Sequence, residues 1–417
     1  MPTDFLEQLN AEFFNGALAP LVLERLRALP VERADARGFV ERAFRLMHQA
    51  GLPATDVSPF QGDLLGSLIA RLLPGTWGGR IPPITVAGRH RKFDMLVARV
   101  CGEHGRMLDI ACGFPPFTSV DSANDLPGWD ILGVDRALPE FLLEDGLDNY
   151  ASFNADGEVQ YFQPTTPTKE NWGALLGDYD GNQRRLEALF RHLHSGGTAP
   201  PGASLVRHPI AQYERDNLHF VRADLDALST PPATVIRCFN MLMYFDAGFR
   251  ARALPLFADL LQDGGLLLYG VDWAYSIECR YVTMRKRDGR LAAGEFAFSL
   301  DNLTPVGIVP WYTLQPDEPE ALRLASLSRV LRDDAAFIRE YTECADAMRH
   351  EYGICERQPD GYFADVSLEL PPAELWLRMS EFSTRLDAAL GPRAVAVLTA
   401  AGHSTRINEV GHVAVRV

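Results

Sequence analysis

The sequence predicts an α/β protein whose core is a mostly parallel β-sheet. The segment from Arg106 to Asp135 has the pattern of a βαβ unit: an apolar strand, a turn rich in glycine and proline, a helix, and a second apolar strand that ends in an acid. Three more apolar strands follow within 220–228, 234–245 and 260–273. The chain closes on a helix to about Ala401 and two short strands meeting near Gly411, which is typical of an antiparallel hairpin at a sheet edge.

Length and composition fit this class. The 417 residues allow two or three domains at roughly 150 residues each. Hydrophobic residues make up 47% and charged residues 23%, which is close to the globular average and excludes general disorder. The net charge of −15 would repel a nucleic-acid backbone or an anionic membrane, so we expect neither as a partner.

The start of the chain and the cysteines point to a cytoplasmic protein. The first ten residues, MPTDFLEQLN, do not have the pattern of a secretory signal, and no apolar run reaches 18 residues. The six cysteines are scattered without paired spacing or neighbouring histidine ligands. We therefore predict reduced thiols and no metal site.

The remaining segments surround this core. Residues 1–85 have apolar positions at helical spacing between prolines, which predicts a helical N-terminal cap that could also serve a homodimer. The core, a Rossmann-like sheet of seven strands, is assigned to 86–273 and 391–417. Two large α/β insertions interrupt the chain: one at 138–213, and one at 274–390 that we interpret as a substrate or lid subdomain.

The turn after the first strand has residues suited to a nucleoside. Ala111, Cys112 and Gly113 follow the strand that contains Asp109, and Asp135 ends the next strand 22 residues after Gly113. A glycine turn lets the backbone approach a ligand closely, and an acid at the tip of the next strand can accept both ribose hydroxyls. The turn continues as Phe-Pro-Pro-Phe, and because proline has no N–H donor, a diphosphate cradle is disfavoured.

This order of motifs resembles class I S-adenosylmethionine-dependent methyltransferases. The sequence LDIACG (108–113) is similar to their first motif, and ILGVD, ending at Asp135, matches their ribose-binding acid. ADL at 223–225 is similar to their adenine-contacting motif, and the final helix and two strands are similar to their reversed hairpin. The matching pieces cover roughly half of the chain. Ala111 and Pro115 depart from the usual glycines, which makes this turn stiffer than the family norm.

The resemblance implies S-adenosylmethionine as cofactor and S-adenosylhomocysteine as product. The cofactor-binding positions that it implies are Asp109 near the amino group, Ala111, Cys112 and Gly113 under the methionine portion, Asp135 with the adjacent Arg136 at the ribose, Asp224 and Leu225 at adenine, Asn240 and Met241 toward the methyl group, and Arg91 at the carboxylate. Alternatively, Asp135 caps a helix, Met241 is ordinary packing, and Arg91 belongs to a solvated helix start.

The candidate catalytic residues are Tyr244, Asn240 and Asp272, which follow the fourth and fifth strands. Reacting groups of this fold lie at the carboxyl ends of its strands. Orientation alone contributes roughly 7–11 kcal/mol to such a transfer, so a general base is not obligatory.

The leading function is transfer of a methyl group to an O, N or S nucleophile of a small molecule, for example in secondary metabolism. One alternative is attack at the methionine carbon beside sulfur, which gives aminocarboxypropyl transfer or cyclisation with release of methylthioadenosine. Another is a binding protein that retains the fold without catalysis. The sequence leaves the acceptor unidentified.

Overall fold

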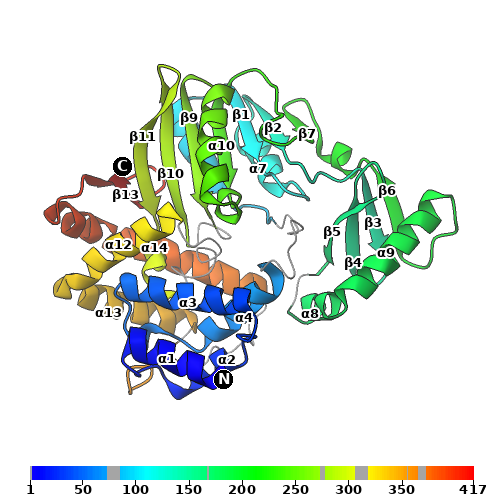
Figure 1. The fold of residues 1–417 in the computed structure, drawn as a ribbon. Helices are drawn as coiled ribbons and strands as arrows, with labels where there is room; N and C mark the ends of the chain where they lie inside the picture. Colours follow the sequence, from blue (N-terminus) through cyan, green and yellow to red (C-terminus); the bar gives the residue numbers. More distant parts are fainter. Residues whose placement is uncertain are drawn as a thin grey trace.

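The structure, a computed structural model, describes residues 2–72, 85–166, 169–272, 278–305, 318–354, 356–364 and 372–417. At its centre is a nine-stranded mixed sheet with the order β12-β13-β11-β10-β9-β8-β1-β2-β7 (Figure 1). Its parallel half consists of β7 (Leu218–Val221), β2 (Trp129–Val134), β1 (Gly105–Ile110), β8 (Ala233–Phe239) and β9 (Leu261–Val271). Its antiparallel half consists of β10 (Arg280–Arg287), β11 (Arg290–Phe298), β13 (Val413–Arg416) and β12 (Thr405–Ile407). The predicted α/β class with a parallel core and an antiparallel C-terminal pair is confirmed.

The main sheet has nine strands, whereas the sequence predicts seven. The two additional strands are the hairpin β10–β11, which belongs to the segment 274–390 that we interpret as an insertion. In the structure Arg280 pairs with Val271 of β9, and Phe298 pairs with Val413 of β13. Tyr281 is fully buried, as is Phe298. The hairpin therefore lies inside the sheet because its large apolar side chains are covered there on both faces.

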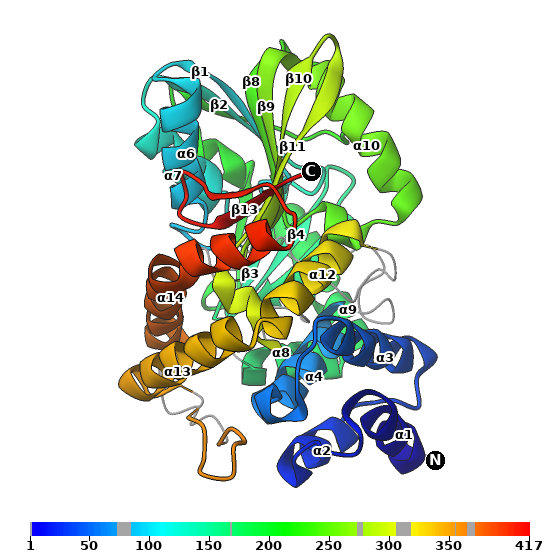
Figure 2. The ribbon, with the colours of Figure 1, turned by 90° about the vertical axis from the view of Figure 1, so that its left-hand side faces the viewer.

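Helices cover both faces of the parallel half (Figure 2). On one face α6 (Arg91–Cys101) and α7 (Phe117–Asp125) share a core with alternate strand residues such as Met107 and Val235. On the other face α10 (Ala247–Leu260) packs on the intervening residues, such as Leu108 and Ile236. This arrangement explains why the central strands are continuous apolar runs in the sequence.

A layer of helices lies against the carboxyl edge of the sheet (Figures 1 and 2). It contains α1 (Pro2–Phe14), α2 (Pro20–Arg27), α3 (Ala34–Gln49) and α4 (Phe60–Leu72) from the N-terminus, and α12 (Pro319–Asp333), α13 (Ala335–Tyr352) and α14 (Pro372–Ala400) from the later part of the chain. Both groups belong to a single hydrophobic core. Ser328 of α12 also donates a hydrogen bond to the Ala50 carbonyl after α3. The apolar faces of the N-terminal helices are thus packed on helices of the second predicted insertion.

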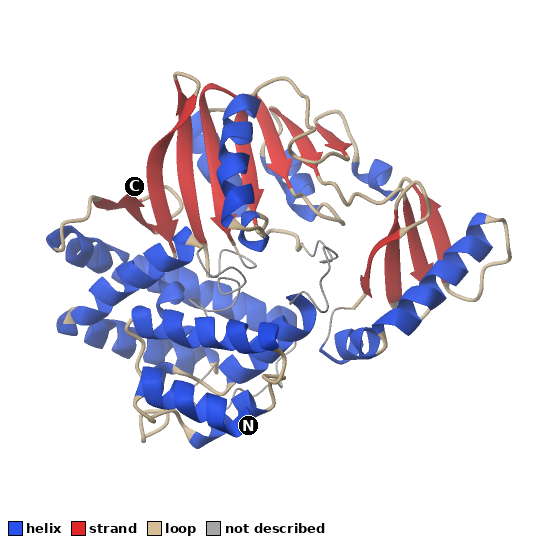
Figure 3. Ribbon diagram, in the orientation of Figure 1, coloured by secondary structure: helices blue, strands red, loops and turns tan. Residues whose placement is uncertain are grey.

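The insertion after β2 forms a separate four-stranded antiparallel sheet (Figure 3). Its strands are β3 (Phe141–Asp145), β4 (Asn149–Phe153), β5 (Val159–Pro164) and β6 (Ala203–Arg207), in the order β5-β4-β3-β6. Two helices, α8 (Lys169–Gly177) and α9 (Tyr179–His194), pack on one face, where Phe190 stacks on Phe153 with ring centroids 4.1 Å apart. Across the described ranges, none of the helices has the length and apolarity needed to cross a membrane.

Candidate functional site

The predicted site residues follow neighbouring parallel strands, so the structure brings them to one edge of the sheet. Ile110 at the end of β1 pairs with Val134 at the end of β2, and Phe239 at the end of β8 pairs with Gly270 in β9. The strand order reverses between β1 and β8, which is where ligands bind in open α/β sheets. This edge faces the helical layer (Figure 3).

The turn after β1 joins the tip of β2 through backbone and side-chain hydrogen bonds. Ala111 and Gly113 both have positive φ, 60° and 74°. The Ala111 N–H donates to the Val134 carbonyl at 2.7 Å, and the Gly113 N–H donates to Asp135 Oδ2 at 3.1 Å. Asp135 Oδ1 accepts the Ala137 N–H at 2.8 Å. The turn and the acid therefore form one rigid unit, as the motif predicts.

The Asp135 carboxylate can still receive a ligand. Each of its oxygens accepts one backbone N–H, and an ionised carboxylate offers about four acceptor positions. Burial raises the pKa of Asp135, whereas the N–H groups of Ala137 and Gly113 oppose that shift by stabilising its charged form. Two acceptor positions beside a close-approaching backbone suit the vicinal hydroxyls of a ribose.

Beneath this turn lies a buried ion pair that the sequence pattern does not predict. Arg237 of β8 is fully buried, and its Nε and Nη2 donate to the two Asp109 oxygens at 3.0 and 2.9 Å. Its Nη1 donates to Asp94 Oδ1 at 2.8 Å, and the Ser119 hydroxyl donates to Asp109 Oδ2 at 2.6 Å. We expect Asp109 from the sequence to lie near a cofactor amino group. Instead it is committed to this ion pair, because Arg237 requires buried counter-charges. The available signal was an arginine inside an otherwise apolar strand.

At the ends of β8 and β9, the structure brings Asn240 and Asp272 together. Asn240 has a φ of 55°, and its Nδ2 donates to the Asp272 carbonyl at 2.7 Å. The Asp272 N–H in turn donates to Asn240 Oδ1 at 3.0 Å. This two-way amide contact holds the end of β9 against the end of β8, so Asn240 is a positioning residue for Asp272.

The Asp272 carboxyl is fully buried beside the His90 ring. His90 Nε2 lies 3.9 Å from Asp272 Oδ2, and within the described part of the chain neither side chain has a hydrogen-bond partner. Burial places the pKa of Asp272 well above its ordinary value and the pKa of His90 well below. The Arg89 charge opposes the shift of Asp272, and Arg89 also interacts electrostatically with Tyr244. Two unpartnered buried titratable groups at the switch-point edge make this a candidate functional site.

The other predicted site residues differ in exposure, and not all of them lie at this edge. The Arg91 side chain is 70% exposed and lies 3.3 Å from Asp125 at the end of α7, so the structure does not bring it to the edge. Arg136 is exposed beside Asp135, and Asp224 is exposed after β7. The half-buried residues Leu225 and Met241 pack on the α10 core, and Cys112 is buried under the turn. Trp273 and Tyr275, which follow Asp272 in the sequence, lie outside the described residues.

No protein-family model matches the sequence, and the search of curated proteins also finds no match. Fifty-three chains of solved structures match. PKMT2 from Rickettsia typhi in complex with AdoHcy is 14% identical with a TM-score of 0.20, and the match covers 40% of this chain but only 21% of PKMT2. N-methyltransferase NodS from Bradyrhizobium japonicum, in complex with S-adenosyl-L-homocysteine, is 13% identical over 49% of this chain and 70% of NodS, with a TM-score of 0.22.

An O-methyltransferase family 2 protein from Planctomyces limnophilus, in complex with apigenin, is 14% identical, with a TM-score of 0.28. That match covers 100% of this chain and 91% of that protein. Because all these TM-scores are low, the fold assignment rests on the strand order and register of this chain.

Proposed function

We propose that this chain is an S-adenosylmethionine-dependent methyltransferase that acts on an O, N or S nucleophile of a small molecule. The observation that carries the proposal is the unit formed by Gly113 and Asp135 at the switch point of the sheet. There a positive-φ glycine and a carboxylate with two remaining acceptor positions lie 3.1 Å apart, N to Oδ2. A close-approaching backbone and a hydrogen-bond-accepting carboxylate fit a nucleoside with a free ribose diol. The prolines that follow Gly113 in the turn disfavour a diphosphate.

Each residue of the edge has a role in this proposal. Asp135 binds the ribose hydroxyls, and the Ala111–Gly113 backbone passes under the methionine portion. The exposed Asp224 binds the adenine amine beyond β7. S-adenosylmethionine, when bound, supplies a methyl group already activated on a sulfonium, so the protein mainly aligns the nucleophile and excludes water.

The His90–Asp272 pair is the proposed acceptor for the proton of the nucleophile. Because burial lowers its pKa, His90 is uncharged at neutral pH and can accept a proton from a hydroxyl, amine or thiol. In its ionised form, the Asp272 carboxyl 3.9 Å away stabilises the imidazolium that results. Asn240 keeps Asp272 in place through its two hydrogen bonds to the peptide.

The test is calorimetric titration of the full chain with S-adenosylmethionine and S-adenosylhomocysteine, in parallel with an Asp135→Ala variant. Loss of a charge-assisted contact of about 1.5–3 kcal/mol weakens both ligands roughly 10- to 150-fold. The matched control is Asp130→Ala. Asp130 is an exposed acid of β2, the strand that precedes Asp135, and its carboxylate lies 3.6 Å from the Arg106 side chain. This substitution leaves both affinities unchanged. The proposal would be refuted if neither ligand bound to the wild-type chain.

Mass analysis of the cofactor after incubation with phenol, amine and thiol acceptors separates the reactions. S-adenosylhomocysteine indicates methyl transfer, whereas methylthioadenosine indicates aminocarboxypropyl transfer or cyclisation. Binding without any product from any acceptor is the result expected of a non-catalytic binding protein.

A further inference from the structure

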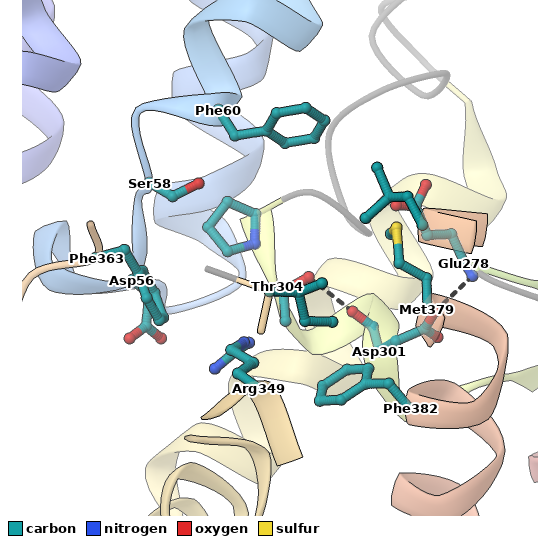
Figure 4. A pocket seen from close by; sticks show the side chains of 13 residues that line it. Asp56, Ser58, Phe60, Glu278, Asp301, Thr304, Arg349, Phe363, Met379 and Phe382 are labelled. Carbon is teal, nitrogen blue, oxygen red and sulfur yellow. Dashed lines mark hydrogen bonds between the residues drawn. The ribbon is translucent and has the colours of Figure 1, made fainter. Parts of the chain in front are cut away.

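A pocket of about 100 Å³ lies where the helical layer meets the carboxyl edge of the sheet (Figure 4). Its walls come from segments far apart in the sequence: the start of α4, the region after β11, α13 and α14. This volume is smaller than the engineered cavity of about 150 Å³ that is known to hold benzene, so at most one small ring fits inside it. A ring of that size can be enclosed here while the rest of a ligand extends outward.

Aromatic and apolar side chains line most of the pocket. Phe60, Phe363 and Phe382 contribute rings, and Met379 of α14 contributes a flexible thioether. Figure 4 shows Phe60 across the pocket from Met379 and Phe382. The cation of the lining, Arg349, is already engaged, since its Nη1 donates to Asp346 at 2.8 Å and its guanidinium lies 4.8 Å from the Phe363 ring centre. The lining therefore suits an apolar ring.

Two buried carboxyl groups stand on the side toward the sheet. Glu278 and Asp301 are each 5% exposed, and the Glu278 N–H donates to Asp301 Oδ2 at 2.7 Å. Asp301 also accepts the Ser299 hydroxyl. Burial raises the pKa of both groups, and the charge of Asp301 adds to the shift of Glu278. Hydrogen bonds from the Ser299 hydroxyl and the Glu278 N–H, together with the charge of Lys92, oppose the shift of Asp301. A cation bound between them would offset the unfavourable proximity of two buried acids.

This side of the pocket adjoins the candidate site. Glu278 lies just before β10, whose Arg280 pairs with Val271 at the end of β9, one residue before Asp272. The Asp301 charge also acts on Asp272, raising its pKa. A ligand that placed its cationic group at Glu278 and Asp301 would therefore lie on the side of the pocket toward Asp272.

We propose that this pocket binds the acceptor substrate and that the acceptor is a ring-bearing amine, cationic at neutral pH. This inference rests on the proposed function, because it assigns the pocket to the substrate of that same edge. The rings of Phe60, Phe363 and Phe382 enclose the apolar body, and the carboxyls of Glu278 and Asp301 bind the ammonium group.

The test uses three probes that share a phenyl ring and differ in charge: 2-phenylethylamine, 2-phenylethanol and 3-phenylpropanoate. Each is titrated calorimetrically into the full chain saturated with S-adenosylhomocysteine, and into the chain alone. We expect the amine to bind at least tenfold more tightly than the alcohol or the acid. Asp301→Asn weakens the amine roughly 10- to 100-fold and the alcohol less than about threefold, because only the amine loses a charge-assisted contact.

Matched controls distinguish the pocket from its surroundings. Asp387→Asn changes another buried acid, which accepts the Leu300 N–H and does not line the pocket, so we expect only a minor change in amine binding. Met379→Trp fills the pocket and abolishes binding of all probes, whereas Leu377→Trp, at a 58% exposed position of the same helix, does not. The comparison of Met379→Trp with Leu377→Trp also tests the proposal if Asp301→Asn fails to fold.

The outcomes separate this inference from the proposed function. Equal affinity for the amine and the alcohol, tighter binding of the acid, or unchanged binding in Met379→Trp would overturn the assignment of a cationic ligand to this pocket. If S-adenosylhomocysteine binds and no probe does, the pocket assignment fails alone. If the amine binds as expected and neither cofactor form does, the proposed methyltransferase function fails and the amine site stands.

Discussion

Substituting Arg237 tests whether the buried ion pair holds the turn of the candidate site. In the structure the guanidinium makes five hydrogen bonds, which include both oxygens of Asp109 and one oxygen of Asp94. These contacts join β8 to β1, α6 and α7 in the interior. Arg237→Met keeps most of the apolar volume of the side chain and removes all five hydrogen bonds.

The expected loss in the free energy of unfolding is large. Asp109 is 3% and Asp94 is 1% exposed, so the variant leaves two carboxyl groups in the interior without a cation. Breaking a buried ion pair by removing one partner costs about 3–5 kcal/mol. Arg237→Lys retains the charge, but its single ammonium group cannot bind both acids as the planar guanidinium does. We expect it to lower the free energy of unfolding by less than Arg237→Met does.

The loss has a defined pH dependence. Without the opposing charge of Arg237, burial raises the folded-state pKa of Asp94 further above its unfolded value near 3.9, so the folded variant binds more protons than the unfolded chain. In wild type, burial already raises the pKa of Asp94 to about 7, against the opposing charge of Arg237. Stability of the variant therefore falls as pH rises above about 4, and its deficit relative to wild type is larger at pH 8 than at pH 5.

The assay is guanidinium titration at both pH values, followed by tryptophan fluorescence, because Trp129 is 1% exposed in the core that α6 and α7 share with the sheet. Arg106→Met on the neighbouring strand is the control, since Arg106 lies in a partly exposed pair 3.6 Å from Asp130 and its loss costs less than about 1 kcal/mol. A deficit below about 1 kcal/mol for Arg237→Met, or one that is equal at pH 5 and pH 8, would show that the network does not stabilise this region.

Two further predictions concern buried groups. His412 is 1% exposed and burial lowers its pKa to about 3, so between pH 7 and pH 5 only the unfolded chain takes up a proton on this residue. In denaturant titrations at these two pH values, we expect wild type to lose about 2 kcal/mol of stability that His412→Gln does not lose. Equal pH dependence of the two proteins would contradict this. Asn240→Gly retains the positive φ and removes both side-chain hydrogen bonds to the Asp272 peptide. We expect the free energy of unfolding to fall by about 1–3 kcal/mol in the same titration. Unchanged stability would mean that the amide contact does not join β8 to β9.

The parts of the site that follow local patterns could be predicted from the sequence. The strand before Ala111 and the strand before Asp135 are short apolar runs, and their lengths set which residues follow each strand end. Because parallel neighbours end at the same edge, Gly113 and Asp135 meet without any information from the rest of the chain. Asn240 and Asp272 meet for the same reason at the ends of β8 and β9.

Residues whose environment depends on distant segments could not be placed in this way. Arg89 and Arg91 stand two residues apart in the basic run 89–92, and only the packing of α6 on α7 puts Arg91 at the surface beside Asp125. Arg237 has the charge of a surface residue, and its burial becomes intelligible only with Asp109 and Asp94 around it. His90 belongs to the same basic run, and only the tertiary structure places its ring against Phe239 and 3.9 Å from Asp272.

The sequence by itself determined the α/β class, the parallel half of the sheet and the turn that follows β1, because these depend on apolar periodicity and on the conformational freedom of glycine. Only the tertiary structure decided that β10 and β11 enter the main sheet, that the N-terminal helices share a core with α12 to α14, and that distant segments enclose a pocket beside Glu278. The physical reason is that burial of apolar surface is summed over the whole chain, so which amphipathic faces meet depends on every other face that must also be covered.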